Sequence, residues 1–154
     1  MNVKFENVWQ QPVKPVQEVL RVWTDYFQMD AGEQQRRMDE LVYVVRGADD
    51  QVIGISTAKQ VFIKQFQNNF LAVRFMIIPG HRFPGLMSKL VMITRDYLEA
   101  KGGHLGVGLI ALIENEEMKR TLRAPVLPSG FVYAGNSAAG HHIRIYYFKG
   151  ARIA

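Results

Sequence analysis

The sequence predicts a mixed α/β (α+β) fold, with a mostly antiparallel central sheet of about seven strands flanked by about four helices. Apolar residues switch repeatedly between strand and helix spacing, in the order strand, two helices, three strands, helix, strand, helix, two strands. Short polar turns separate the three consecutive strands, which is typical of an antiparallel meander. A chain of 154 residues is also long enough to bury a core, so residues 1–154 are expected to form a single domain.

The first half of the chain is expected to hold one strand, two helices and then the meander. Asp30 is followed three residues later by Glu33, which resembles a capping box at the start of the second helix. Pro12 and Pro15 mark the entry to the first helix. The predicted elements cover residues 3–5, 16–27, 31–40, 41–46, 52–63 and 70–78.

The second half begins with a long amphipathic helix after Gly85, which we expect to stop at Gly102 and Gly103 in the position of a C-cap glycine. The nearly continuous apolar run from Leu105 to Ile113 is typical of a strand that is buried on both faces. The remaining predictions are a short helix over 115–122 and strands over 131–134 and 143–148.

Composition excludes several classes of protein. The chain has no cysteine, which excludes disulfides, cysteine nucleophiles and thiolate metal sites. No apolar run reaches the ~18 residues of a membrane span, so we expect a cytoplasmic protein with no membrane partner. The net charge of +5 suits an anionic partner. The basic residues are spread along the sequence, which favours solvated helix faces over a nucleic-acid footprint.

The most informative segment runs from Ile77 to Met87, between the last strand of the meander and the long helix. It contains Gly80 and Gly85 and reads as a loop that leads from a strand into a helix start. Unpaired backbone N–H groups and the positive end of the helix dipole meet at such a junction. The segment is therefore a candidate anion-binding loop.

The same residues resemble the pyrophosphate loop of the GNAT superfamily of acyl-CoA-dependent N-acyltransferases. In that family the pattern runs apolar, any, Pro, two any, Gln or Arg, two any, Gly, any, Gly or Ala. Ile77, Pro79, Arg82 and Gly85 fall in register, whereas Met87 stands where the family has a small residue. The predicted order of elements is also the GNAT order, so the resemblance spans nearly the whole chain. It implies an N-acyltransferase that uses acetyl-CoA or another acyl-CoA as co-substrate.

The resemblance implies which residues hold the cofactor. Backbone groups of the strand would bind the pantetheine arm, and loop amides with Arg82 would bind the phosphates. Pro84 has no N–H, so one donor of the loop is missing. The cofactor-binding residues implied in this way are Phe75, Ile77, Ile78, Arg82, Phe83, Gly85, Leu86, Met87 and Asn115.

The catalytic residues of the family are not all present. Its general acid is a tyrosine at the position of Leu122, and its general base is a glutamate on the strand before the loop, which here has no carboxylate. Glu114 is a candidate base or a solvated residue at a helix start. Tyr133 is a candidate acid or a packed strand tyrosine. His81 is a candidate phosphate partner or proton shuttle, or an exposed loop residue.

Three functions stay open: an acyltransferase for an amine of a small molecule, peptide or protein; a degenerate CoA-binding module; and a GNAT-like protein that modifies or binds nucleic acid. The oligomeric state, including a homodimer, is open too. The four histidines lack the spacing of a helical metal pair, and no metal site is expected. The glycines of 106–111 match a dinucleotide fingerprint by letters, but they lie within a strand, so we discount it.

Overall fold

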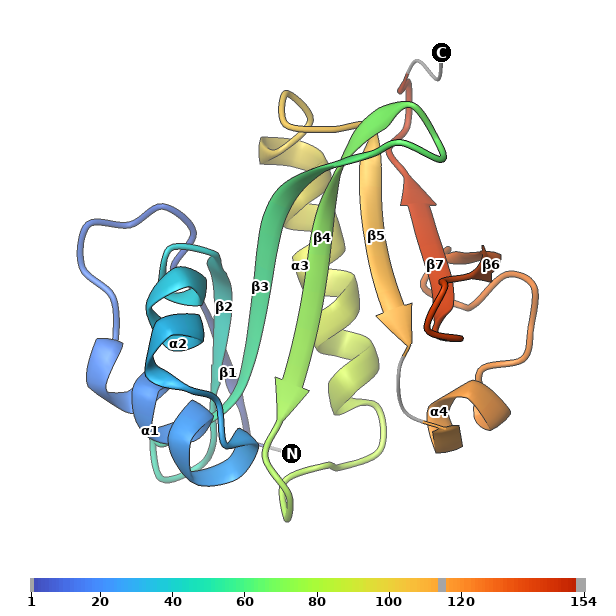
Figure 1. Cartoon of the computed structure of the whole chain (residues 1–154). Coiled ribbons are helices and arrows are strands. Elements are labelled where there is room, and N and C mark those ends of the chain that lie inside the picture. Colours follow the sequence, from blue (N-terminus) through green and yellow to red (C-terminus); the bar gives the residue numbers. More distant parts are fainter. Residues whose placement is uncertain (1, 114–115, 152–154) are drawn as a thin grey trace. The chain divides into compact units, whose positions relative to one another are not determined.

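The computed structural model describes residues 2–113 and 116–151 (Figure 1). Its helices and strands follow the predicted order and confirm the predicted fold class. The elements are β1 (Lys4–Asn7), α1 (Val16–Phe27), α2 (Ala31–Met38), β2 (Leu41–Arg46), β3 (Val52–Ile63), β4 (Asn68–Ile77), α3 (Leu86–Lys101), β5 (Gly108–Ile113), α4 (Glu116–Thr121), β6 (Val132–Asn136) and β7 (His142–Tyr147).

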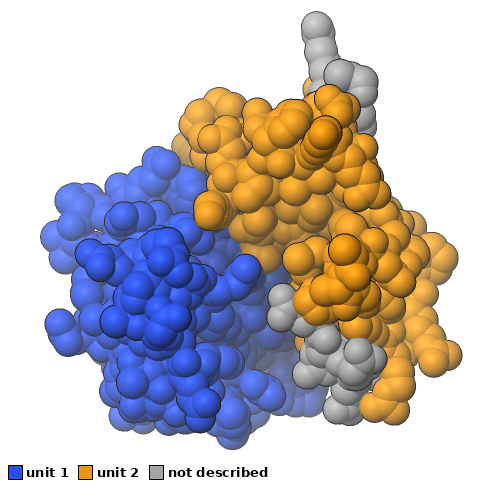
Figure 2. All heavy atoms as spheres, in the orientation of Figure 1, with its two compact units in different colours: residues 1–58, 74–94 blue, residues 59–73, 95–154 orange. Residues whose placement is uncertain are grey.

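The strands form a seven-stranded sheet in the order β1-β2-β3-β4-β5-β7-β6. β4 and β5 are parallel and pair at Leu71 with Leu109 and at Ala72 with Ile110. β1–β2, β2–β3, β5–β7 and β6–β7 are antiparallel. The chain divides into two compact units (Figure 2): unit 1 comprises residues 1–58 and 74–94, and unit 2 comprises residues 59–73 and 95–154.

Unit 1 has a core built from α1, β2, β3 and the start of α3. The apolar stripe of α1 places Val19, Val22 and Trp23 in this core with no exposed surface. Leu86 and Leu90 bury the first turns of α3 in the same cluster. Burying each of these side chains stabilises the fold by roughly 1.5–3 kcal/mol relative to leaving it exposed. The end of β4 and the start of α3 are therefore held by the core, and the loop between them starts and finishes at fixed points.

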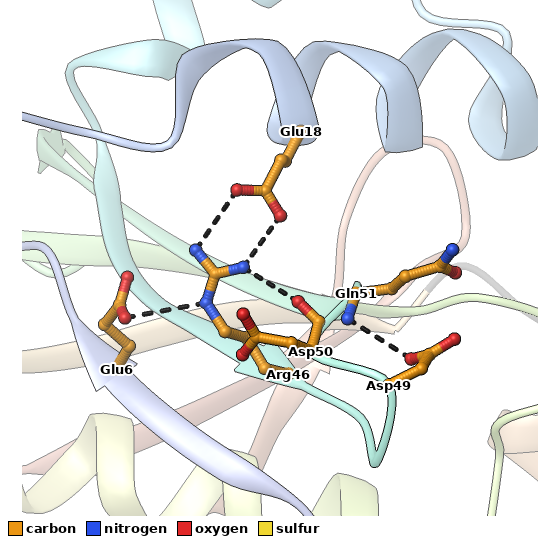
Figure 3. Close-up of polar contacts among 6 residues, drawn as sticks. All are labelled: Glu6, Glu18, Arg46, Asp49, Asp50 and Gln51. Carbon is orange, nitrogen blue, oxygen red and sulfur yellow. Dashed lines mark hydrogen bonds and ion pairs between the residues drawn. The ribbon is translucent and has the colours of Figure 1, made fainter.

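A half-buried arginine of β2 joins three other segments of unit 1 (Figure 3). Arg46 Nη1 and Nη2 donate to the two carboxylate oxygens of Glu18 at 2.7 and 3.2 Å, which links β2 to α1. Its Nε lies 3.5 Å from Glu6 Oε2 on β1, and Nη1 also donates to the carbonyl of Asp50 in the β2–β3 turn. These carboxylates raise the pKa of the Arg46 guanidinium, with the Glu18 hydrogen bonds as the largest cause.

Half of the predicted capping box of α2 is present, because the Glu33 carboxylate pairs with Arg36 and Arg37 instead of the Asp30 N–H. Asp30 Oδ1 accepts a hydrogen bond from the Glu33 N–H at 2.9 Å, as a helix N-cap requires. The helix ends at Met38, two residues before the predicted end at residue 40, since Glu40 N–H bonds to the Arg37 carbonyl in a closing turn.

Unit 2 has its own apolar cluster on one face of β4, β5 and β7. Phe70, Ile110, Ile143 and Ile145 form its buried centre. The other face is packed against the second half of α3, where Tyr146 of β7 donates its hydroxyl to Glu99 at 3.0 Å. Burial and then the neighbouring Glu99 raise the pKa of Tyr146.

Two sequence predictions in unit 2 are wrong in detail. α3 stops at Lys101 as expected, but Gly102 and Gly103 are absent from the glycines with positive φ, so neither is a left-handed cap. Gly102 is needed for space, because a Cβ there would lie 2.9 Å from the Leu98 carbonyl oxygen and 3.0 Å from the Leu71 side chain. β5 is not buried along both faces either, since Leu112 keeps 47% of its surface exposed.

Candidate anion-binding loop and catalytic residues

The loop between β4 and α3 has a defined backbone path. After Ile78, the His81 N–H closes a turn onto the Ile78 carbonyl at 3.2 Å. Gly80 and Gly85 adopt φ values of +86° and +82°, which only glycine adopts readily. Gly85 directly precedes the first residue of α3, so the chain turns into the helix at a glycine, as the sequence predicts.

Several backbone N–H groups of this loop have no internal partner. Within residues 2–113 and 116–151, no carbonyl or side chain accepts a hydrogen bond from the N–H of Arg82, Phe83, Gly85, Met87 or Ser88. All five lie within the loop or the first turn of α3, where the helix dipole is positive. An anion at this position would accept hydrogen bonds from N–H groups that otherwise bind water.

Arg82 adds a positive charge to the same loop. Its Nε donates to the Ile77 carbonyl at 3.0 Å, which ties the side chain back to the end of β4. In the described part of the chain no carboxylate pairs with its guanidinium. The two terminal nitrogens thus remain as donors beside the free N–H groups, and a guanidinium is suited to bidentate binding of phosphate.

The strand that leads into the loop offers backbone groups rather than side chains. Ile77 and Ile78 are buried, at 2% and 5% exposure, and Phe75 packs partly buried against the core. The Ile78 N–H donates to Ile53 of β3 at 2.9 Å. Since neighbouring strand residues direct their backbone groups to opposite edges, those of Phe75 and Ile77 face away from β3. The Ile77 carbonyl is the one that accepts from Arg82.

The two departures from the GNAT loop pattern have different consequences. Met87 packs partly buried against the core of unit 1, so its long side chain is directed inward. Leu86 is fully buried, and its N–H donates to the Phe83 carbonyl at 3.1 Å, so of these two residues only Met87 offers an unpaired N–H to a ligand. Pro84 has no N–H, which leaves a break in the row of donors between Phe83 and Gly85.

His81 lies half-buried inside the loop and stacks on Phe83, with ring centroids 6.2 Å apart and an interplanar angle of 12°. Its Nδ1 is buried and has no hydrogen-bond partner among the described residues. Phe83 is 46% exposed. The stack orients the imidazole within the loop, which is compatible with either predicted role, phosphate partner or proton shuttle.

Tyr133 is the candidate acid that the structure describes best. It lies on β6 with 45% of its surface exposed, and its hydroxyl donates to Asn136 Oδ1 at 2.6 Å. The Arg144 guanidinium carbon lies 5.6 Å from the centroid of its ring. The hydroxyl is therefore accessible, although in this arrangement its proton is directed to Asn136.

Arg144 holds the segment that follows α4. It is 2% exposed and donates to the carbonyls of Leu122, Ala124 and Pro125 at 2.5, 2.8 and 3.3 Å. Burial lowers the pKa of this guanidinium, and Tyr133 opposes that shift. Leu122 occupies the position of the family's acid and offers its backbone carbonyl to Arg144, so this position supplies no proton donor.

Two of the predicted site residues, Glu114 and Asn115, lie outside the described residues.

The structure adds a candidate site residue that the sequence did not indicate. His142 contacts Tyr133 edge-to-face, with ring centroids 5.4 Å apart, and its Nδ1 is buried without a partner in the described part of the chain. It pairs with Ile113 of β5, so it lies beside the end of the strand that precedes Glu114. Only the strand register reveals that His142 lies beside the end of β5, because His142 and Ile113 are far apart in sequence.

The glycines of 106–111 serve close packing, since a Cβ on Gly108 would lie 2.2 Å from the Tyr146 carbonyl oxygen. Within residues 2–113 and 116–151, no three histidine, aspartate or glutamate side chains gather as metal ligands. No helix in that part of the chain is long and apolar enough to cross a bilayer.

No protein-family model and no curated protein matches the sequence. Solved structures do match. A structure of a bacterial toxin has a TM-score of 0.66 at 14% identity, covering 96% of this chain and 92% of that chain. The ribosomal-protein-S5-alanine acetyltransferase from Vibrio fischeri has a TM-score of 0.60 at 17% identity, covering 97% and 95%. A GNAT family acetyltransferase from Brucella melitensis in complex with acetyl-CoA has a TM-score of 0.55 at 16% identity, covering 98% and 91%. At these identities the matches show the fold.

Proposed function

We propose that this chain, which has the GNAT fold, is a single GNAT-like domain that binds acyl-CoA and transfers the acyl group to an amine. The observation that carries the proposal is the loop after β4, where five unpaired backbone N–H groups and the Arg82 guanidinium gather at the start of α3. These donors suit a diphosphate, because they combine fixed positive charge with several hydrogen bonds. Acetyl-CoA is bound in the structure from Brucella melitensis, which supports the choice of ligand.

In the proposed complex the pyrophosphate occupies the loop and the pantetheine arm runs along β4. The N–H and carbonyl of Phe75 and the N–H of Ile77 face the strand edge directed away from β3, where an extended amide chain would add like another strand. Arg82, Phe83, Gly85 and the first turn of α3 would hold the two phosphates. The break at Pro84 predicts weaker binding than a loop with every N–H in place.

The proposed reaction is direct attack of a neutral amine on the thioester carbon. A C–N bond forms, the C–S bond breaks, and the electron pair of that bond leaves with the CoA sulfur. A base must take one proton from the amine nitrogen, and an acid must give one to the thiolate. We assign the base to Glu114 and the acid to Tyr133, both from the sequence. His81 is assigned to the phosphates.

One observation favours a second candidate, a CoA-binding module with little catalysis. The position of the family's acid is Leu122, and the Tyr133 hydroxyl donates its proton to Asn136. A protein that binds acyl-CoA but has no acid in place would be stabilised by the ligand without turning it over.

Two measurements on the wild-type protein distinguish the acyltransferase from the CoA-binding module. A thermal shift with acetyl-CoA reports binding, because a ligand that binds only the folded chain raises the melting temperature. Release of free CoA thiol in the presence of primary amines, with mass spectrometry of the acetylated product, reports transfer. We expect a shift and amine-dependent thiol release. A shift without transfer supports the binding module, and no shift at millimolar acetyl-CoA contradicts both.

A further inference from the structure

The net positive charge of the chain lies in one of its two units. Unit 1 contains nine lysines and arginines and nine acidic residues, whereas unit 2 contains ten basic residues and five acidic ones. The whole net charge of +5 is therefore in unit 2. Unit 1 thus has no net charge, whereas unit 2 has an excess of five positive charges.

Much of this excess gathers at one end of unit 2, where the β3–β4 hairpin meets the loop between α3 and β5. The Gln60 side chain donates to the Leu105 carbonyl at 2.8 Å, and the Val107 N–H donates to the Asn69 carbonyl at 2.9 Å. Residues 59–73 and 100–113 contain no aspartate or glutamate. They contain three exposed lysines, Lys59, Lys64 and Lys101.

The same end presents an aromatic ring and a hollow. Val61, Ile63 and Phe70 pack into the apolar cluster of unit 2, so by strand alternation Phe62 and Asn69 face the opposite side, toward α3. Phe62 is 58% exposed. A hollow of about 230 Å³ at this end is lined by Asn68, Asn69, Gly103, His104, Leu105, Gly106 and Val107. We call Gln60, Phe62, Lys64, Asn69, Lys101 and residues 103–107 the hairpin-end surface.

Local charges of the opposite sign are few. The C-terminus of α3 carries a partial negative charge of roughly half an electron, which Lys101 in its last turn offsets. Glu99 is occupied, since it accepts hydrogen bonds from the Tyr146 hydroxyl and the Lys149 N–H. The surface thus combines positive charge, an exposed ring and amide groups around a hollow.

We propose that the hairpin-end surface binds single-stranded nucleic acid. The ring of Phe62 stacks on a base, and Lys64 and Lys101 contact the phosphates. The side-chain amide of Asn69 and the backbone groups of Gly103, His104 and Gly106 contact base edges in the hollow. This assignment lies within unit 2, shares no residue with the acyl-CoA loop and does not depend on the proposed acyl transfer.

Fluorescence anisotropy with a labelled mixed-sequence single strand of about 15 nucleotides tests the proposal, since a binding site spans roughly 4–16 nucleotides. Binding by the wild-type chain should weaken as salt rises, because phosphate contacts release counterions. Lys64→Glu with Lys101→Glu should weaken binding at least tenfold and flatten the salt dependence. Phe62→Ala should weaken binding about tenfold and leave the salt dependence unchanged, because stacking is not ionic.

The matched control is Lys4→Glu with Arg21→Glu, two exposed residues of unit 1 that give the same change in net charge. It should alter the Kd less than twofold. Lys64→Gln with Lys101→Gln serves if the glutamate variant fails to fold. The proposal is overturned if the wild type does not bind at low salt, or if the control weakens binding as much as the lysine pair. It is also overturned if Phe62→Ala leaves the Kd unchanged. Equal competition by heparin, duplex DNA and the single strand would overturn it too, because it would show that the chain attracts any polyanion.

Discussion

Arg82 Nε donates a hydrogen bond to the carbonyl of Ile77 across 3.0 Å, so the loop's arginine is fastened to the last residue of β4. The bond fixes where the guanidinium lies before any ligand arrives. Such preorganisation lowers the entropy lost on binding, because the side chain is already held in one arrangement. Lysine at this position would keep the charge but lose both the fork of donors and the Nε contact.

The two left-handed glycines of the loop allow a stability prediction. A Cβ on Gly80 or Gly85 would meet no atom within 4 Å, so alanine is not excluded by space. It is disfavoured by conformation, since φ is +86° and +82°. We expect Gly80→Ala and Gly85→Ala each to lower the free energy of unfolding by about 1–2 kcal/mol in urea titrations. Only Gly85→Ala should also weaken acetyl-CoA binding, because relief of the left-handed φ would displace the Gly85 N–H of the proposed anion-binding loop. Wild-type stability in both variants would contradict the assigned backbone.

Removal of the Tyr133 hydroxyl should slow acyl transfer without affecting binding. Tyr133 is exposed, and its hydroxyl bonds only to Asn136 among the described residues, so Tyr133→Phe should fold normally. Loss of a general acid typically costs about a hundredfold or more in turnover. We expect kcat to fall by that amount while the Kd for acetyl-CoA stays constant. Tyr147→Phe, on the neighbouring strand β7, is the control and should keep its turnover. An unchanged kcat for Tyr133→Phe would remove Tyr133 from the mechanism.

Arg144 should be important for stability rather than chemistry. Its guanidinium donates to three carbonyls, and truncation leaves those acceptors without their partner. Arg144→Met should therefore lower the free energy of unfolding by about 2 kcal/mol, measured by denaturant titration. Arg123→Met, at an exposed position nearby, should change it by less than about 0.5 kcal/mol. Equal effects of the two changes would show that the carbonyl contacts contribute little.

Glu33 should stabilise the folded chain at neutral pH and lose this effect in acid. Hydrogen bonds from Arg36 and then Arg37 hold the pKa of this carboxyl below its usual range. A depressed folded pKa stabilises the protein above the unfolded pKa of about 4.3, and the contribution disappears as pH falls through the lower folded value. The difference in melting temperature between wild type and Glu33→Gln should thus be present at pH 7 and shrink as the pH falls below the unfolded pKa of about 4.3. A difference that persists unchanged at low pH would contradict the pairing.

Local patterns in the sequence predicted most of the fold. The period of the apolar residues depends on which face each element buries, so it fixed the kind and order of the elements, including α1 and the meander. The capping role of Asp30 was also predictable, because its partner lies three residues away. The role of Gly102 was not, since the close contact that requires a glycine comes from Leu71 on another element.

For the candidate site, too, only the part that is continuous in sequence was predictable. The loop from Ile77 to Met87 is continuous in sequence, and its anion-binding character follows from a strand, a glycine and a helix start. The neighbourhood of Tyr133 was not predictable, because Asn136, His142 and Arg144 approach it through the hairpin of β6 and β7. The gathering of charge in unit 2 was also hidden, since the basic residues look evenly spread until the chain divides into units.

Calorimetric titration of acetyl-CoA into the wild-type chain, Arg82→Ala and Arg74→Ala tests the central claim most directly. Both arginines are exposed residues of unit 1, so the two variants lose the same charge, but only Arg82 belongs to the loop. We predict that Arg82→Ala binds at least tenfold more weakly than the wild type, as expected for loss of charge-assisted hydrogen bonds to phosphate. Arg74→Ala should bind within twofold of the wild type. No heat of binding with wild type at millimolar acetyl-CoA, or equal loss in the two variants, would contradict the loop as the acyl-CoA site.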